Sequence, residues 1–205
     1  MDLNEIRNLS DHSNEFDKFY SELLNCSINL PIDALFVEIG TRAGGSALLA
    51  LKAINDSKIN RTMITIDPYG LKPFVNSDRT NLRLYGENLY REALKNITDY
   101  CFYNELDHIH FKITSFDFIK IFEQIELWKD EQVLQPKFGY VYLDGEHNEN
   151  TVTKELEYFL PRTVENGLIV IDDIEHIKNS NNPLIKNVLS ESRFTGNRSF
   201  YTKKG

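Results

Sequence analysis

The sequence predicts an α/β fold: a doubly wound, mostly parallel, seven-stranded sheet with helices on both faces. Five short apolar runs, each too brief to be a helix, alternate with stretches whose apolar residues recur at helical spacing. Strands joined through helices in this way lie parallel in one sheet. The tail at residues 193–203 places Thr195-Gly196-Asn197 between two β-prone pieces, which predicts a closing antiparallel hairpin.

Length and composition indicate one globular domain over residues 1–205. The chain is 41% hydrophobic and 26% charged, and its net charge of −8 argues against a nucleic-acid partner. No run reaches the roughly eighteen apolar residues of a membrane span, and residues 1–5 do not resemble a signal peptide. We therefore expect a cytoplasmic protein without a membrane partner. Cys26 and Cys101 have no metal or redox spacing and are expected to be reduced core thiols.

The predicted strands are recognised by short apolar runs that end at glycine, proline or acidic residues. The first ends at Gly40, the second at Asp67, and the others before Thr114, Asp144 and Asp172. They are expected at residues 34–39, 62–66, 109–113, 138–143 and 168–171.

The predicted helices are recognised by apolar residues three and four positions apart. An N-terminal helical segment is expected within residues 1–33, and Pro161 is expected to close the helix before the fifth strand. Polar residues 67–83, punctuated by proline and glycine, predict a long loop. The helices are expected at residues 16–24, 46–54, 89–97, 116–127, 151–160 and 183–189.

A glycine-rich turn follows the first strand, in a sheet whose ligands bind beyond the carboxyl ends of its strands. Gly40, Gly44 and Gly45 let the chain turn tightly and let a ligand approach the backbone. A dinucleotide fingerprint would need glycine where the chain has Arg42, and a P-loop would need lysine where it has Ser46. Both phosphate-binding motifs therefore fail. A turn with no ligand remains the alternative.

The remaining pattern is an acidic residue, Glu38, two positions before the first glycine of the turn. It resembles the first motif of class I S-adenosylmethionine-dependent methyltransferases, in which the loop passes under the methionine part of the cofactor. The resemblance implies S-adenosyl-L-methionine as cofactor. The cofactor-binding residues expected in this segment are Glu38, Gly40, Thr41, Gly44, Gly45 and Ser46.

Two further strand ends are candidates for the nucleoside part of that cofactor. Asp67 follows the second strand, where a carboxylate can accept hydrogen bonds from ribose hydroxyls; ordinary turn chemistry of Asp67-Pro68 is the alternative. After the third strand, the resemblance implies that Ser115 and Phe116 contact adenine. Capping of the next helix by Ser115 is the alternative there.

Three aspartates follow the last two parallel strands. Asp144 ends one, and Asp172 and Asp173 end the next, so they should converge on one edge of the sheet. Carboxylates this close repel each other unless a cation or a proton lies between them. Oxygen ligands of this kind suit Mg²⁺, Ca²⁺ or Mn²⁺. Helix capping and a solvated acidic rim are the alternatives.

Residues 138–174 resemble the macrocin- and novobiocin-type branch of metal-dependent sugar O-methyltransferases. The shared pattern is Asp-Gly-x-His or a near variant, a helix, Leu-Pro, a glycine turn and Asp-Asp. The resemblance implies a Rossmann-like fold and a divalent cation, Mg²⁺ or another, bound by Asp144, Asp172 and Asp173. It implies methyl transfer to a hydroxyl oxygen of a sugar or other small polyol.

A hydroxyl acceptor needs a group that takes its proton, and His147 and Asp144 are the candidates. His147 lies three residues beyond Asp144 on the same edge, although a lone histidine can equally be a polar loop residue. Residues 68–103 are expected to form a lid and acceptor-recognition insertion, with a plain surface helix as the alternative. A small-molecule acceptor and a second copy of the chain, as a homodimer, are the expected partners.

Three other functions remain open at this point. A catechol-type O-methyltransferase would use the same cofactor, but that branch usually has Asp-Asn where this chain has Asp172-Asp173. A non-catalytic nucleoside-binding partner module is the second. The third, a nicotinamide oxidoreductase, is disfavoured by Arg42.

Overall fold

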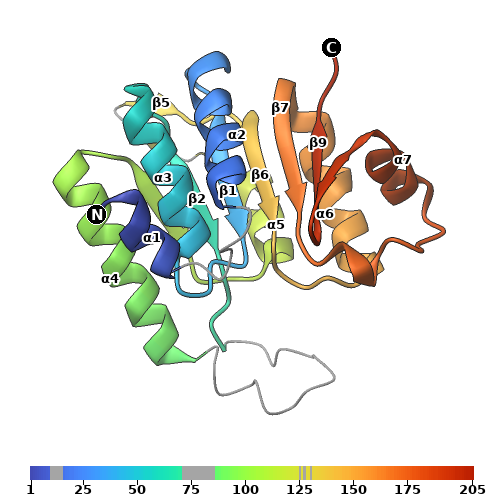
Figure 1. Ribbon diagram of the computed structural model, residues 1–205, viewed down its shortest axis with the longest axis horizontal. Coiled ribbons are helices and arrows are strands. Elements are labelled where there is room, and N and C mark those ends of the chain that lie inside the picture. The colour runs from blue at the N-terminus through green and yellow to red at the C-terminus, as the bar shows by residue number, and fades with distance from the viewer. Residues whose placement is uncertain (10–15, 71–85, 125, 127, 130) are drawn as a thin grey trace.

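A computed structural model describes the chain except residues 10–15, 71–85, 125, 127 and 130. It contains a seven-stranded sheet in the order β3-β2-β1-β6-β7-β9-β8 (Figure 1). The first five strands in this order are parallel, and β9 is antiparallel to both of its neighbours. The predicted fold class is confirmed. The strands are β1 (Leu35–Ile39), β2 (Met63–Ile66), β3 (His108–Phe111), β6 (Phe138–Leu143), β7 (Thr163–Ile171), β8 (Arg193–Thr195) and β9 (Arg198–Thr202).

Helices cover both faces of the sheet, and each face has its own apolar core. One core contains residues of α1 (Leu3–Leu9), α2 (Phe16–Asn29), α3 (Gly45–Ser57) and α4 (Glu87–Asn104). In Figure 1, α2 and α3 cross the near face of the sheet. The opposite core contains residues of α5 (Ser115–Gln124), α6 (Glu149–Arg162) and α7 (Pro183–Glu191). In the described part of the chain, no helix has both the length and the apolar character that a membrane span requires.

Some boundaries differ from the prediction. Pro161 lies inside the last turn of α6, which continues to Arg162. Strand β7 begins at Thr163, which pairs with Phe138 of β6. Glu165 and Asn166, further along this part of the strand, are exposed. Helix α5 ends at Gln124, and a two-stranded ladder follows it. The ladder consists of β4 (Trp128–Lys129) and β5 (Gln132–Val133), and a short 3-10 helix (Ile174–His176) follows β7.

Arg61 fixes α2 to the sheet. Its side chain is 1% exposed and lies just before β2, where it donates hydrogen bonds to the backbone carbonyls of Ser27, Leu30 and Pro31. These carbonyls belong to the end of α2 and the turn after it, where helical hydrogen bonds run out. One buried guanidinium therefore satisfies several orphaned acceptors and places α2 over the near face.

Candidate active site

The candidate site lies along the carboxyl edge of the sheet, where the first residue after each of four strands continues the backbone hydrogen-bond ladder. Each of these residues donates its N–H to the last carbonyl of the neighbouring strand. The bonds are Asp67 to Phe111 (3.1 Å), Gly40 to Ile66 (2.9 Å), Asp144 to Ile39 (2.9 Å) and Asp172 to Leu143 (3.0 Å). Residues predicted from distant parts of the sequence therefore form one row.

Gly40 is required by a close approach inside this row. Its φ is +88°, and a Cβ at this position would lie 2.0 Å from the carbonyl oxygen of Asp144. Only glycine accepts both conditions. The turn after β1 and the end of β6 are in direct contact as a result.

Gly44, predicted to bind the cofactor, also has a role in helix packing. It caps α3 at φ +86°, and a Cβ there would lie 3.1 Å from the Cδ1 atom of Ile97 in α4. Its missing side chain therefore makes room for packing between α3 and α4. A substitution at Gly44 would disturb the helices as well as any ligand.

A cavity of about 190 Å³ joins the glycine turn to Asp144. Helix α4, within the predicted insertion at residues 68–103, contributes Leu89 and Glu92 to it, and α1 contributes Leu9. The part of that insertion at residues 71–85 lies outside the described residues. The remaining lining residues come from the turn after β1: Gly40, Thr41, Arg42, Ala43, Gly45 and Ser46.

Glu38 is buried beneath this turn with no hydrogen bond to either carboxylate oxygen from the described residues. Burial raises the pKa of Glu38 well above its usual value; the neighbouring Ser46 side chain opposes this rise and the charge of Asp67 adds to it. The Thr41 hydroxyl, also buried, has no described partner either. Unpaired buried polar groups are costly. This part of the site therefore has acceptor groups that a ligand with N–H or O–H donors would satisfy.

Asp67 connects the turn after β1 to the turn after β2. One carboxylate oxygen accepts the backbone N–H of Arg42 at 3.0 Å and the other that of Tyr69 at 2.9 Å. Burial raises the pKa of Asp67, and these backbone hydrogen bonds oppose the rise. Asp67 therefore does stabilise the turn, which was the alternative to ligand binding. Each oxygen keeps a second lone pair for a ligand hydroxyl.

Ser115 and Phe116 begin α5 and do not line the cavity described above. The residue that caps α5 is Thr114, whose hydroxyl accepts the backbone N–H of Asp117 at 3.2 Å. Ser115 is therefore not the capping residue. It lies beside Glu155, while the Lys154 ammonium lies 5.0 Å from the centre of the Phe116 ring.

His147 lies between two carboxylates. Its Nε2 atom is 3.8 Å from Asp144 Oδ1 and 3.6 Å from Asp173 Oδ2. The Asn197 side chain donates a hydrogen bond to Asp173 at 2.8 Å, and the His176 ring lies 6.2 Å from that of His147. Burial lowers the pKa of His147, and the charge of Asp173 opposes that shift. The lowered pKa favours the neutral ring, which can accept a proton.

Asp172 is bound elsewhere in the site. Its Oδ2 atom accepts hydrogen bonds from the Tyr142 hydroxyl at 2.5 Å and from Arg198 at 3.2 Å. The described residues hold no group of three His, Cys, Asp or Glu side chains placed for a metal ion. Asp144 and Asp173 are brought together around His147, whereas Asp172 faces Arg198. The sequence offered no signal for Arg198, because arginine in a terminal hairpin is ordinarily a surface residue.

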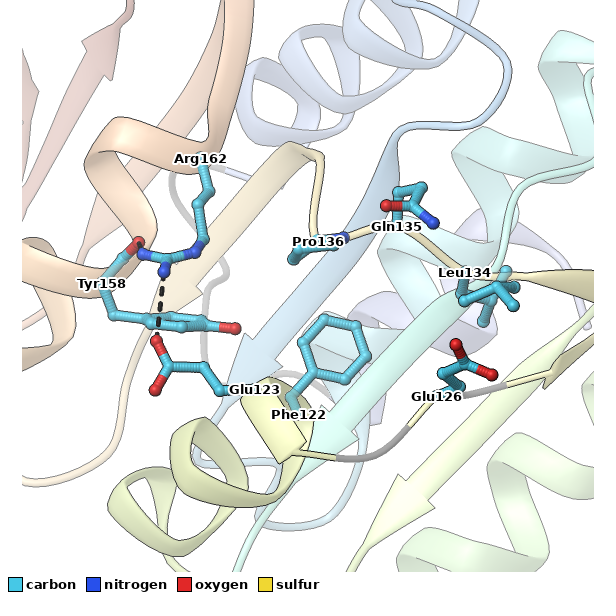
Figure 2. Close-up of a pocket in the computed structure, with 9 residues that line it drawn as sticks. Phe122, Glu123, Glu126, Leu134, Gln135, Pro136, Tyr158 and Arg162 are labelled. Carbon is cyan, nitrogen blue, oxygen red and sulfur yellow. Dashed lines mark hydrogen bonds and ion pairs between the residues drawn. The ribbon is translucent and has the colours of Figure 1, made fainter.

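A second cavity, of about 510 Å³, lies at the opposite edge of the sheet (Figure 2). It is formed where α5 and α6 end and β6 begins. Its Arg162 is paired with Glu123 at 3.1 Å and lies 4.1 Å from the centre of the Tyr158 ring. No residue predicted to bind a ligand lines it. Its location away from the strand ends argues against it as the reaction site.

Sequence comparison identifies the family of this chain. The family profile described as a methyltransferase domain matches residues 37–174, from the middle of β1 to the start of the 3-10 helix after β7. The chain belongs to this methyltransferase family. No curated protein matches it by sequence.

Several solved methyltransferases share the fold. CalS11, a TDP-rhamnose 3′-O-methyltransferase of calicheamicin biosynthesis, is 14% identical; the alignment covers 98% of this chain and 91% of CalS11, with a TM-score of 0.56. The S-adenosylhomocysteine-bound PaMTH1 of Podospora anserina is 10% identical (99% and 86% covered, TM-score 0.55). MycE of the mycinamycin pathway, solved with Mg and S-adenosylhomocysteine, is 15% identical (100% and 55% covered, TM-score 0.56).

Proposed function

We propose that this methyltransferase transfers the methyl group of S-adenosylmethionine to a hydroxyl oxygen of a small molecule, with a sugar or other small polyol favoured. The observation that carries the proposal is the cavity that joins the glycine turn after β1 to Asp144, beside His147. Of the methyltransferases with this fold, CalS11 is described as a TDP-rhamnose 3′-O-methyltransferase, which supports a sugar acceptor. The Asp172-Asp173 pair favours this class over catechols.

The residues of the turn fit the cofactor. Glu38 and Thr41 supply buried acceptors without described partners, and Gly40, Gly44, Gly45 and Ser46 form the turn around them. We assign Asp67 to the ribose hydroxyls, and Ser115 and Phe116 to the adenine ring. The cofactor supplies an electrophilic methyl group on sulfur. The protein must bring the acceptor oxygen in line with it, which by itself accelerates such reactions greatly.

His147 is proposed to take the proton. As the oxygen–carbon bond forms and the carbon–sulfur bond breaks, the hydroxyl proton moves to Nε2 of His147. The imidazolium that results lies 3.8 Å from Asp144 and 3.6 Å from Asp173, so both carboxylates stabilise it. Asp144 has a pKa raised by burial and by the charge of Asp172, which makes it the second candidate acceptor of the proton.

The sequence predicted a divalent cation, but the residues expected to bind it do not support one. The MycE structures hold Mg. In this chain the carboxylate of Asp172, one of the three expected ligands, is committed to Arg198 and Tyr142. We therefore route no step through a metal ion, and the assembly of Asp144, Asp172 and Asp173 into a metal site stays a sequence-based prediction. We also propose that the enzyme is a homodimer and that it methylates its acceptor in the cytoplasm.

The test combines calorimetry with methyl transfer. S-adenosylhomocysteine should bind the protein, and labelled S-adenosylmethionine should methylate at least one member of a panel of nucleotide sugars, glycosides and catechols. Product only from catechols would move the protein to the catechol-type class. Absence of heat with either form of the cofactor would leave a non-catalytic module as the better explanation.

A further inference from the structure

We propose that Arg198 is the permanent counter-cation of the aspartate edge, so that this methyltransferase works without a bound divalent metal. The inference deepens the proposed function and rests on it for the identity of the reaction. It concerns a residue of β9 that no sequence pattern singled out.

Arg198 and Tyr142 together saturate one carboxylate oxygen of Asp172, Oδ2. The Nε and Nη2 atoms of Arg198 both lie 3.2 Å from Asp172 Oδ2, the oxygen that also accepts the Tyr142 hydroxyl at 2.5 Å. The other oxygen of Asp172 accepts the backbone N–H of Asp173 at 2.9 Å. A metal ion bound through Oδ2 would have to compete with these donors for the same lone pairs.

Burial makes this competition unequal. The side chains of Arg198 and Asp172 are only 9% and 8% exposed. A guanidinium left without its partner in such a place is strongly unfavourable, and arginine cannot lose its charge as lysine can. The Phe19 ring of α2 lies 5.9 Å from the guanidinium carbon, on the side of the core. Arg198 is therefore held by an anion, a hydroxyl and an aromatic ring from three different elements.

Arg198 also acts on the next strand end. Three carboxylates at one edge require a positive charge or a proton between them. The backbone N–H of Asp172 donates to the carbonyl of Leu143, the residue before Asp144, at 3.0 Å, so the guanidinium bound to Asp172 belongs to the same part of the sheet edge as Asp144. The guanidinium thus supplies the positive charge for which a metal ion was expected.

Manganese titration tests the inference directly. Mn²⁺ would be added to the full-length protein, and binding would be followed by loss of the electron paramagnetic resonance signal of free Mn²⁺. The wild-type protein should leave this signal unchanged. Arg198→Gln, which frees Asp172, should bind Mn²⁺ about tenfold or more tightly than wild type. Adding Asp172→Asn to that variant should remove the gain.

Arg193→Gln is the matched control, because Arg193 lies on the same hairpin and pairs with Glu22 at the surface. It should behave as wild type. Micromolar binding of Mn²⁺ by the wild-type protein, lost in Asp172→Asn, would overturn the inference. So would a folded Arg198→Gln that gains no affinity.

Mn²⁺ binding by the wild-type protein tests the inference even if Arg198→Gln does not fold. A second wild-type measurement is the thermal unfolding midpoint, which Mg²⁺ should leave unchanged; a rise with Mg²⁺ would overturn the inference. Neither measurement uses the cofactor or an acceptor. A failure of the proposed function would show instead in the S-adenosylhomocysteine titration.

Discussion

Glu155 is a buried acid on α6 that has no part in the proposed reaction. One of its oxygens has no hydrogen-bond partner from the described residues, and burial raises its pKa to about 8. The folded protein therefore keeps this carboxyl protonated where the unfolded chain, with a pKa near 4.5, has lost the proton. The stabilisation is complete below that lower value and is lost as the pH rises towards 8.

Glu155→Gln should remove this pH dependence. At pH 9 the variant should be more stable than wild type, by an amount on the order of 2–4 kcal/mol, because no buried carboxyl has to ionise. Urea unfolding at pH 5, 7 and 9 measures the difference. The exposed Glu157 on the same helix gives the control, Glu157→Gln. Parallel stability curves for wild type and Glu155→Gln would contradict the prediction.

His147→Gln should slow methyl transfer by about 100- to 10,000-fold, the range typical of a lost general base. The amide fills much the same space but cannot take the proton. Binding of S-adenosylhomocysteine should be unchanged, because His147 does not line the cofactor cavity. His176→Gln, whose ring is exposed 6.2 Å away, is the comparison and should retain most of the rate. Equal loss in both variants would point to a general disturbance of the loop.

At the scale of elements, β3 carries two histidines that are kept neutral. Thr65 on β2 lies 2.8 Å from a ring nitrogen of both His108 and His110. Burial lowers the pKa of each ring to about 4, against an ordinary value of 6.5. Between pH 4 and pH 6.5, the two rings are therefore protonated in the unfolded chain and neutral in the folded chain. Stability present above pH 6.5 is lost as the pH falls towards 4.

His108→Gln should weaken this acid sensitivity. The amide can still bond to Thr65, but it takes up no proton on unfolding. The loss of unfolding free energy between pH 7 and pH 4 should shrink by an amount on the order of 2–3 kcal/mol. Denaturant titrations at the two values measure it. An unchanged loss would show that His108 is protonated equally in the folded and unfolded chains.

The sequence predicted the interior elements well and their ends less well. The strands β1, β2 and β6 are buried throughout and mostly apolar, and these short runs define them without help from tertiary structure. The start of β7 could not be found in this way, since it depends on the pairing of Thr163 with Phe138 of β6 and on the hydrogen bond from Asn166 to Lys203 beyond β9. Pro161 was expected to end α6, yet proline is tolerated in the last turn here.

At the scale of the whole molecule, the site was predictable as far as topology dictates it. Parallel strands expose their carboxyl ends at one edge, so the grouping of Gly40, Asp67 and Asp144 followed from their positions after strands. Arg198 could not be predicted, because the antiparallel return of β9 beside β7 brings it to Asp172. That pairing depends on how the chain closes its sheet.

Cofactor binding should stabilise the whole fold. At about 100 times its dissociation constant, S-adenosylhomocysteine should add about 2.7 kcal/mol to the unfolding free energy. Asp67→Asn should weaken that binding about tenfold, since a ribose hydroxyl loses an acceptor. Calorimetric titration and thermal unfolding with and without ligand measure both effects. Identical affinity in the variant would place the ribose away from Asp67.

The row of backbone hydrogen bonds along the sheet edge has a kinetic consequence. The amide protons of Gly40, Asp67, Asp144 and Asp172 are each locked to the adjacent strand, so they should exchange with solvent deuterium only when the central sheet opens. The sheet edge against which a ligand binds would then be rigid before the ligand is bound. Any slowing of exchange that a ligand causes should be found in α4 and in the turn after β1, which carry the other walls of the cavity.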